Sequence, residues 1–343
     1  MTRSKKAVLG AGLLFGVVAS IGITATVGWR PLMGPKIRPV TDRRFDPSPA
    51  RLERGAYLVK HVAGCFFCHS EMDTGTEGFP TRAGMEGAGR SWAHDGIPWI
   101  VAPNITPDPQ TGAGSWSDDT IARAIREGIG HDGRALFPLM PYENFRVMSD
   151  EDLASVIAYI RSIPPVSRSL PSSEIPFPAS RMINLVPQPI DAPVTAPDSS
   201  TPVARGQYLV TLASCGHCHT PRDAQGQYLP GMAFAGGNMF QYDSKTPAAS
   251  ANLTPSSSGI PYYTEALFLE TIRTGRVRER KITDLMPWGH YRGMTDEDLK
   301  AIFAYLQTLA PVEHYVDNAM PPTRCAQCNL EHGGGVKNRS GGR

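Results

Sequence analysis

All six cysteines of the 343-residue chain stand in Cys-x-x-Cys pairs. The pairs are Cys65/Cys68, Cys215/Cys218 and Cys325/Cys328. Cysteine used only in this spacing indicates haem attachment, metal binding or redox chemistry rather than a disulfide scaffold. The first two pairs are followed directly by a histidine, His69 and His219.

A Cys-x-x-Cys-His segment matches the chemistry of a c-type haem site. Two thiols on one turn of helix can form thioether bonds to the haem, and the next histidine can ligate the iron. Zinc binding or a redox-active dithiol is the alternative for one such segment, but two copies in matching surroundings favour haem. We therefore expect two covalently bound c-type haems. The residues that hold them are Cys65, Cys68 and His69 for the first, and Cys215, Cys218 and His219 for the second.

These motifs belong to a longer internal repeat. Arg-Gly-x-Tyr-Leu-Val begins at residues 54 and 205, and Asn-x-Thr-Pro begins at residues 104 and 252. Met-Pro recurs at residues 140 and 286, and the offset between copies drifts only from 151 to 146 along the chain. Matching blocks in the same order indicate two copies of one domain, each of about 110 residues.

The sixth iron ligand should recur in both copies, and methionine is a common choice that raises the reduction potential. Met140 or Met148 and, in the second copy, Met286 or Met294 meet this condition. Met148 and Met294 directly precede the expected N-caps of helices, where a hydrophobic staple explains them. We therefore assign Met140 and Met286, each held by a following proline, as ligands; the alternative is that they only fill the core.

Unmatched histidines are treated as ordinary polar residues. They are His61, His94, His131 and His290, while His217 lies inside the second thioether loop and is expected to point away from the iron. Asn104 and Asn252 recur without being ligands. They fit either a hydrogen bond to a haem propionate or the capping of the Thr-Pro turn that follows.

Helical patterns dominate both copies. Helices are predicted at residues 51–64, 118–128, 149–162 and 295–308, with Ser149 as an N-cap. The expected buried positions are Leu52, Ala56, Val59 and Ala63 in the first helix and Val156, Ile157 and Ile160 in the third. No segment alternates convincingly as a strand, so the predicted fold class is all-α.

The predicted domains span residues 46–165 and 203–312, followed by a tail at residues 313–343. Ten prolines between residues 164 and 202 predict an extended connector at residues 166–202. Its apolar side chains favour a strap across the domains over a free tether. These side chains are Ile175, Phe177, Met182, Ile183, Leu185 and Val186.

Residues 1–30 form a predicted signal anchor. Arg3, Lys5 and Lys6 precede twenty-three uncharged residues, 7–29, which could span about 34 Å as a helix. The basic flank places everything after Arg30 outside the cytoplasm. A cleaved signal peptide with a site near residues 23–25 is the alternative. The net charge of +2 gives no indication of nucleic-acid binding.

Taken together, residues 50–312 resemble the multihaem cytochrome c subunits of membrane-bound periplasmic dehydrogenases, such as the alcohol and gluconate dehydrogenases. The motifs are Cys-x-x-Cys-His, Asn-Ile-Thr-Pro-Asp and Met-Pro-Tyr-x-x-Phe-x-x-Met-Ser-Asp-Glu-Asp-Leu. The resemblance implies tandem class I cytochrome c domains with His/Met ligation. It also implies electron transfer from a dehydrogenase subunit or a respiratory donor to quinone or another cytochrome.

The third cysteine pair departs from that family, whose subunits commonly carry three haems. Cys325 and Cys328 are followed by Asn329 in place of a proximal histidine, and only fifteen residues remain after the pair. We interpret the pair as a disulfide or a vestige of a haem site. The alternative is a metal site that uses His332 or ligands from another chain.

The sequence therefore favours an electron carrier without catalytic residues, in the inner membrane as a single-pass protein with periplasmic haem domains. Its partner is expected to be a dehydrogenase subunit or a membrane respiratory complex. A dihaem enzyme, such as a cytochrome c peroxidase or a thiosulfate-oxidising cytochrome, is the alternative. It requires an unusual sixth ligand at one haem, which the matching methionines oppose. A freely diffusing shuttle is a third hypothesis.

Overall fold

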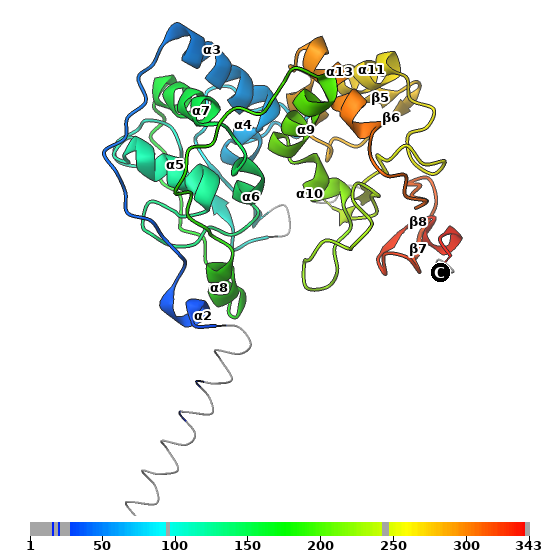
Figure 1. The fold of residues 1–343 in the computed structure, drawn as a ribbon, viewed down its shortest axis with the longest axis horizontal. Coiled ribbons are helices and arrows are strands. Elements are labelled where there is room, and N and C mark those ends of the chain that lie inside the picture. Colours follow the sequence, from blue (N-terminus) through cyan, green and yellow to red (C-terminus); the bar gives the residue numbers. More distant parts are fainter. Residues whose placement is uncertain (1–15, 17–19, 21–27, 94–96, 242–246, 340–343) are drawn as a thin grey trace, which may run out of the picture.

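Two helical domains of similar build lie side by side, joined by a long connector (Figure 1). The computed structural model describes residues 16, 20, 28–93, 97–241 and 247–339. One hydrophobic cluster runs through both domains, from Leu58 and Leu153 in the first to Leu209 and Leu299 in the second. The duplicated sequence thus folds into two units that share a continuous core.

The first domain begins with α3 (Pro49–Tyr57), which continues as the π-helix η1 (Leu58–Val62) and is followed by α4 (Cys65–His69). Its other helices are α5 (Asp118–Glu127), α6 (Tyr142–Phe145) and α7 (Asp150–Ser162). Ser149 caps α7 as predicted, because its side chain accepts a hydrogen bond from the Asp152 amide.

The second domain repeats this order with α9 (Pro202–Leu212), α10 (Cys215–His219), α11 (Glu265–Thr274), α12 (Trp288–Tyr291) and α13 (Asp296–Leu306). Thr295 caps α13 as Ser149 caps α7. The predicted stripe of α7 is buried at Val156, Ile157 and Ile160. In the first helix Val59 is buried as predicted, whereas Leu52, Ala56 and Ala63 are only half-buried. The π-helical turn η1 also buries Leu58 and Val62, which the predicted stripe did not include.

Each domain depends on a close helix crossing at the glycine of the repeated Arg-Gly-x-Tyr block. A Cβ on Gly55 of α3 would lie 2.0 Å from the carbonyl oxygen of Ser155 in α7. A Cβ on Gly206 of α9 would lie 1.9 Å from the carbonyl oxygen of Ala301 in α13. Only glycine allows the two backbones to approach this closely, which explains why both copies carry it.

The tyrosine of the same block crosses to the other domain. Tyr208 donates to Asp152 at 2.8 Å, and Tyr57 donates to Asp298, the equivalent aspartate of the second domain. Each hydroxyl also accepts a backbone amide at the partner helix's N-cap, Ser149 at 3.1 Å or Thr295 at 3.2 Å. Burial, followed by the bond to Asp298, raises the pKa of Tyr57 to about 12. This reciprocal exchange docks the two domains with approximate twofold symmetry.

The prediction of purely α-helical domains is wrong in one respect. Four antiparallel strand pairs occur among the described residues. They are β1 (Arg90–Ser91) with β2 (Val101–Ala102), β3 (Met239–Phe240) with β4 (Ala248–Ala249), β5 (Arg276–Val277) with β6 (Arg280–Lys281), and β7 (Pro322–Arg324) with β8 (Glu331–Gly333). Strands of two or three residues are too short to show a period of two, so the sequence pattern could not reveal them.

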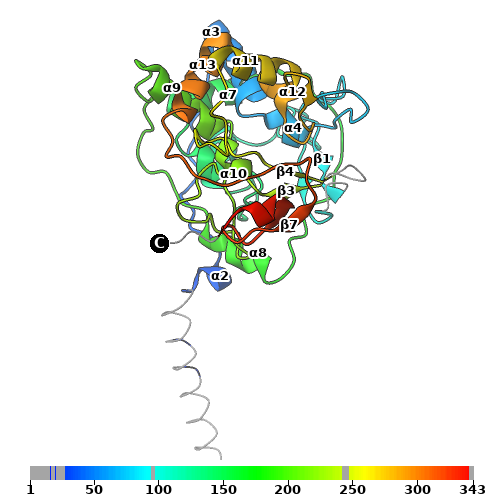
Figure 2. The same ribbon diagram turned by 90° about the vertical axis from the view of Figure 1, so that its right-hand side faces the viewer.

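The connector is hydrogen-bonded along the surface of the first domain, so the strap that was expected across both domains is observed on the first. Ser173 bonds both the amide and the carbonyl of Val101, at 3.0 and 3.1 Å, and the Glu174 amide donates to the Trp99 carbonyl at 2.9 Å. Two short helices, α8 (Ala179–Met182) and the 3₁₀-helix η3 (Ile183–Leu185), pack beside α2 (Arg30–Met33) at one end of the molecule (Figures 1 and 2).

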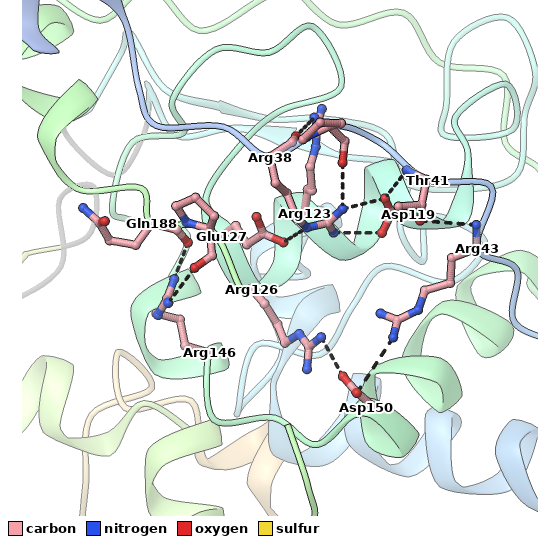
Figure 3. Close-up of polar contacts among 12 residues, drawn as sticks. Arg38, Thr41, Arg43, Asp119, Arg123, Arg126, Glu127, Arg146, Asp150 and Gln188 are labelled. Atoms are coloured by element: carbon pink, nitrogen blue, oxygen red, sulfur yellow. Dashed lines mark hydrogen bonds and ion pairs between the residues drawn. The ribbon is translucent and has the colours of Figure 1, made fainter. Parts of the chain in front are cut away.

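The segment between α2 and α3 is fixed to the first domain by Arg38, a half-buried arginine that binds two buried carboxylates (Figure 3). Arg38 binds Asp119 of α5 through two hydrogen bonds, at 2.7 and 2.8 Å, and binds Glu127 at 2.8 Å. The Thr41 amide donates to the same Asp119 carboxylate at 2.7 Å. The side chains of Asp119 and Glu127 are 1 % and 4 % exposed. The chain that leaves α2 is therefore held at defined points on α5.

Within the described residues, no helix has the length and apolar character needed to cross a bilayer. Apart from residues 16, 20, 28 and 29, the predicted span at residues 7–29 lies outside the described residues.

Candidate functional site: two haem-attachment segments

The two Cys-x-x-Cys-His segments adopt the same backbone conformation. Each forms a short helix, α4 or α10, that begins after a residue in the left-handed region. That residue is Gly64, with φ 60°, in the first domain and Ser214, with φ 55°, in the second. A serine rarely adopts this conformation, so its presence in the second copy indicates that the turn itself is required to present the cysteines and the histidine.

The histidines of both motifs are oriented by the same contact. His69 Nδ1 lies 2.9 Å from the Pro103 carbonyl oxygen, and His219 Nδ1 lies 2.7 Å from the carbonyl oxygen of the equivalent Ala251. A carbonyl can only accept, so Nδ1 carries the proton in both rings and Nε2 keeps its lone pair. Burial lowers the pKa of both imidazoles, which favours the neutral form that ligates a metal.

The surroundings of the thiols also fit a haem. Burial raises the pKa of Cys65 and Cys215 to about 12 and that of Cys218 to about 11. An environment that opposes the thiolate suits a sulfur atom that is neutral in a thioether. The donor set, the ring orientation and the apolar setting are therefore those that a covalently attached haem requires.

Met140 and Met286 occupy equivalent turns. In each, the following proline (Pro141, φ −83° and ψ 49°; Pro287, φ −78° and ψ 46°) forms the N-cap of the next short helix. The amide two residues after the methionine donates to the methionine carbonyl, at 2.8 Å and 2.7 Å, which is the pattern of an inverse γ-turn. Both side chains are half-buried against the shared core.

Met148 and Met294 have a different setting. Their side chains are only 1 % and 3 % exposed, and they lie in the core together with Leu153 and Leu299. This is the arrangement expected of a hydrophobic staple at the start of α7 and α13.

The unmatched histidines have other contacts. His61 Nδ1 lies 3.0 Å from the His290 carbonyl oxygen across the domain interface, and His131 stacks on Trp116 with ring centroids 4.3 Å apart. His217 Nδ1 lies 3.2 Å from the Arg222 guanidinium, and burial lowers the pKa of His217 to about 4. His94 lies outside the described residues.

Asn104 and Asn252 are turn-forming residues. Each side-chain oxygen accepts the amide (2.9 Å) and the hydroxyl (2.7 Å) of the threonine two positions on. Each side-chain nitrogen donates to the segment that follows the last helix of its domain, at Val166 O (2.7 Å) and Val312 O (2.9 Å). These contacts support the turn-capping alternative over contact with a propionate.

Both attachment segments border the domain interface. Phe67, inside the first motif, makes an edge contact with His290 of α12 at a centroid distance of 5.3 Å. The next residue, Tyr291, donates to the carbonyl of Ala213, two residues before the second motif, at 2.8 Å. Burial, and then the nearby thiols of Cys215, Cys218 and Cys68, raises the pKa of Tyr291. Helix α12 therefore links the two segments.

Comparison with known proteins agrees with the duplication. Residues 52–164 and residues 203–310 each match the family described as cytochrome c. One of the subunits of the nicotinate dehydrogenase of Pseudomonas putida is 32 % identical over 317 residues, which cover 87 % of this chain and 24 % of that protein. The gluconate 2-dehydrogenase cytochrome c subunit of Pantoea cypripedii is 32 % identical over 281 residues, which cover 76 % of this chain and 60 % of that subunit.

A third relative is matched over most of its own length. The protein named diheme cytochrome c-type from Cereibacter sphaeroides is 28 % identical over 265 residues, which cover 74 % of this chain and 84 % of that protein. By contrast, the chain spans about a quarter of its nicotinate dehydrogenase relative and less than two thirds of its gluconate dehydrogenase relative.

Proposed function

Because the chain belongs to the cytochrome c family and matches it twice, we propose that it is a membrane-anchored electron-transfer subunit that serves a periplasmic dehydrogenase. The chain carries two covalently bound c-type haems. A bound haem supplies a reversible one-electron iron couple. The observation that carries the proposal is the equivalence of the two attachment segments. In both, a backbone carbonyl accepts a hydrogen bond from Nδ1 of the proximal histidine.

We assign the first haem to Cys65 and Cys68, with His69 as proximal ligand. The second haem is assigned to Cys215, Cys218 and His219. The left-handed residue before each motif and the free Nε2 of each histidine support this assignment. Met140 and Met286 supply the sixth ligands. Their equivalent proline-locked turns support that role, because a rigid loop holds a thioether at a fixed position.

Ligation by methionine at both irons favours a carrier over an enzyme. An iron with six protein and haem ligands has no open position for peroxide or another substrate, whereas a dihaem peroxidase or thiosulfate-oxidising cytochrome needs one. The contact of both attachment segments with α12 supports electron passage between the two haems within the chain.

The partner is proposed from the relatives. Several are named as cytochrome subunits of gluconate, alcohol and fructose dehydrogenases. We infer a dehydrogenase subunit, or another respiratory donor, on the donor side. Quinone or a further cytochrome is the acceptor.

Membrane attachment is proposed from the uncharged sequence of residues 7–29 and from exposed apolar side chains at one end of the described structure. Large apolar side chains are exposed on α2, α8, η3 and their flanks: Trp29, Leu32, Met33, Phe177, Met182 and Leu185. Phe177 and Met33 are 82 % and 75 % exposed, which is unusual for a surface in water. A tryptophan beside Arg30 suits the headgroup region of a bilayer. This end of the molecule therefore supports an inner-membrane position with the haem domains in the periplasm.

The haem assignment predicts a stoichiometry. The pyridine haemochrome assay, expressed per mole of protein, should give about two haems for the native chain. The double variant Cys215→Ala/Cys218→Ala should give about one, because each motif holds one haem. The control Cys325→Ala/Cys328→Ala should keep both. A native value near three would show that the third pair binds haem and would refute the assignment.

The anchor predicts a distribution between membrane and solution. Native protein should stay in the membrane pellet after alkaline extraction and keep an intact N-terminus by mass spectrometry. Val18→Arg should shift protein to the soluble fraction, because a charge at the centre of a span costs about 2.5–3.5 kcal/mol. The control Val40→Arg, on an exposed residue outside the span, should leave it in the pellet. A soluble native chain that begins near residue 26 or 28 contradicts the anchor.

A further inference from the structure

The tail after the second domain gathers four metal-ligating side chains at one point. They are His314, Cys325, Cys328 and His332, and one ligand atom from each lies within 4.8 Å of the others. All four side chains are buried, with exposures of 0 % or 1 %. The third cysteine pair, which neither haem uses, is therefore part of a cluster rather than an isolated dithiol.

The backbone of the tail is folded to present the two sulfurs together. Cys325 directly follows β7, and its amide donates to the Leu330 carbonyl at 2.8 Å across the turn that leads to β8. The Cys328 amide points at Cys325 Sγ, 3.5 Å away. A backbone amide directed at a sulfur is the kind of second contact that orients a metal ligand. Asn329 adopts a left-handed conformation, φ 58°, that closes the turn.

The two imidazoles are oriented towards these sulfurs. His314 Nδ1 donates to the Ala235 carbonyl at 2.8 Å, which leaves Nε2 as an acceptor 3.4 Å from Cys325 Sγ. His332 comes from β8, and its Nδ1 lies 3.2 Å from the Gly333 carbonyl. Its Nε2 is buried without a hydrogen-bond partner. A buried nitrogen without a partner is unfavourable, and ligation to a cation satisfies it.

The wall of the second domain is shaped for both rings. Gly237 has φ +98°, and a Cβ there would lie 2.8 Å from His314 Cε1 and 3.3 Å from His332 Cδ2. The surroundings are apolar, with Met232, Ala235 and Leu330 packed around the cysteines. A closed pocket with four protein ligands leaves no position for water or substrate, which is the property of a structural site rather than a catalytic one.

We propose that His314, Cys325, Cys328 and His332 bind a structural zinc ion. Two thiolates and two imidazoles in a closed four-ligand site are the donor set of structural Zn²⁺. A Cys325–Cys328 disulfide would use the sulfurs but would leave both imidazoles pointing at a neutral group. A third haem lacks its proximal histidine, since Asn329 stands in that place.

The zinc holds the tail against the second domain at the position that corresponds to the place of the connector on the first domain. Asn318 bonds both the amide and the carbonyl of Ala249, at 2.7 and 2.9 Å. Ala249 is the equivalent of Val101, which Ser173 of the connector bonds in the same way. In the first copy this segment is held at both ends because the chain continues into the second domain. In the second copy the hairpin that carries the four ligands fixes the corresponding segment.

This position is next to the second haem-attachment segment. The Ala235 carbonyl accepts from His314, and the amide of the next residue, Gly236, donates to the His219 carbonyl at 2.7 Å. Asn238 donates to the Cys218 and Thr220 carbonyls at 2.8 and 2.7 Å. The loop that faces the zinc on one side therefore holds the backbone of the proximal histidine on the other.

Metal analysis of the native chain, purified without chelators, tests the proposal. Inductively coupled plasma mass spectrometry should find about one zinc per chain beside the haem iron, and X-ray absorption at the zinc edge should show two sulfur and two nitrogen ligands. Cys325→Ala/Cys328→Ala and His314→Ala should each lose the zinc and keep both haems. The control Lys337→Ala, an exposed residue of the same tail, should keep the zinc.

The retained haems show that the variants are folded, and haem content reports on the carrier proposal separately. The metal site would be refuted if the native chain contains no zinc and Cys325 and Cys328 form a disulfide. Mass spectrometry would detect that disulfide as a mass lower by about two units and as cysteines that do not react with an alkylating reagent. Non-haem iron in place of zinc would refute the assignment of zinc as the bound metal. Zinc retained by the cysteine variant would show adventitious binding and would also overturn the proposal.

Discussion

Met140→Ala and Met286→Ala are each expected to remove about half of the weak long-wavelength charge-transfer absorption that marks thioether ligation of ferric haem. Each replacement removes one of the two sulfur ligands and leaves the other domain intact. The reduction potential of the affected haem should fall, because methionine ligation is what raises it. Absorption spectroscopy of the oxidised protein and a redox titration measure both effects.

Met148→Ala and Met294→Ala are the matched controls. Their side chains are buried in the core, so truncation should lower the free energy of unfolding by about 2–5 kcal/mol. The charge-transfer band should remain at its native intensity per haem. If these variants lose the band and the other pair keeps it, the sixth ligands have been assigned to the wrong methionines.

Arg38→Met should lower the free energy of unfolding by about 3–5 kcal/mol, which is typical when one partner of a buried ion pair is removed. Asp119 and Glu127 would remain buried at 1 % and 4 % exposure without their cation. Methionine keeps most of the apolar stem, so the loss isolates the charge and its hydrogen bonds. Denaturant unfolding followed by the Soret absorption measures the change.

The same variant predicts a pH dependence. Burial acts to raise the pKa of Asp119, but the hydrogen bonds and charge of Arg38 together with the hydrogen bond from the Thr41 amide outweigh it, and the pKa is lowered overall. A lowered pKa contributes stability above the usual pKa of an aspartate, and this contribution is lost as the pH falls. The difference between native protein and Arg38→Met should therefore be largest at neutral pH and shrink in acid.

Arg51→Met is the control for Arg38. Arg51 pairs with Glu151 at 2.8 Å, but the glutamate side chain is 65 % exposed, and surface pairs contribute at most about 1 kcal/mol. Equal losses from the two variants would mean that the ion pairs of Arg38 with Asp119 and Glu127, drawn in Figure 3, contribute no more than an exposed surface pair.

Local signals in the sequence predicted much of this structure. The N-caps Ser149 and Thr295 and the stripe of α7 follow from spacing alone, because capping and amphipathic packing act within a few residues. The repeat also predicted equivalent sites in two domains. It could not predict the cross-domain bonds of Tyr57 and Tyr208, since a repeated Tyr and a repeated Asp can pair within one copy or between copies.

The tail shows where sequence reasoning was incomplete. Cys325-x-x-Cys328 followed by His332 gives a partial metal spacing, which is why His332 is an expected ligand of the alternative metal site. His314 was missed because it lies eleven residues before Cys325, and only the tertiary fold brings it to the cluster. Its position just beyond the end of the repeat was the available signal.

The most direct test of the central claim is the charge-transfer intensity of the unmodified oxidised protein relative to its haem content. A carrier with Met140 and Met286 on the two irons should show the full thioether intensity for each haem. Half that intensity would mean that one iron lacks a methionine. That result would contradict the account and favour a dihaem enzyme with an open or unusual ligand position.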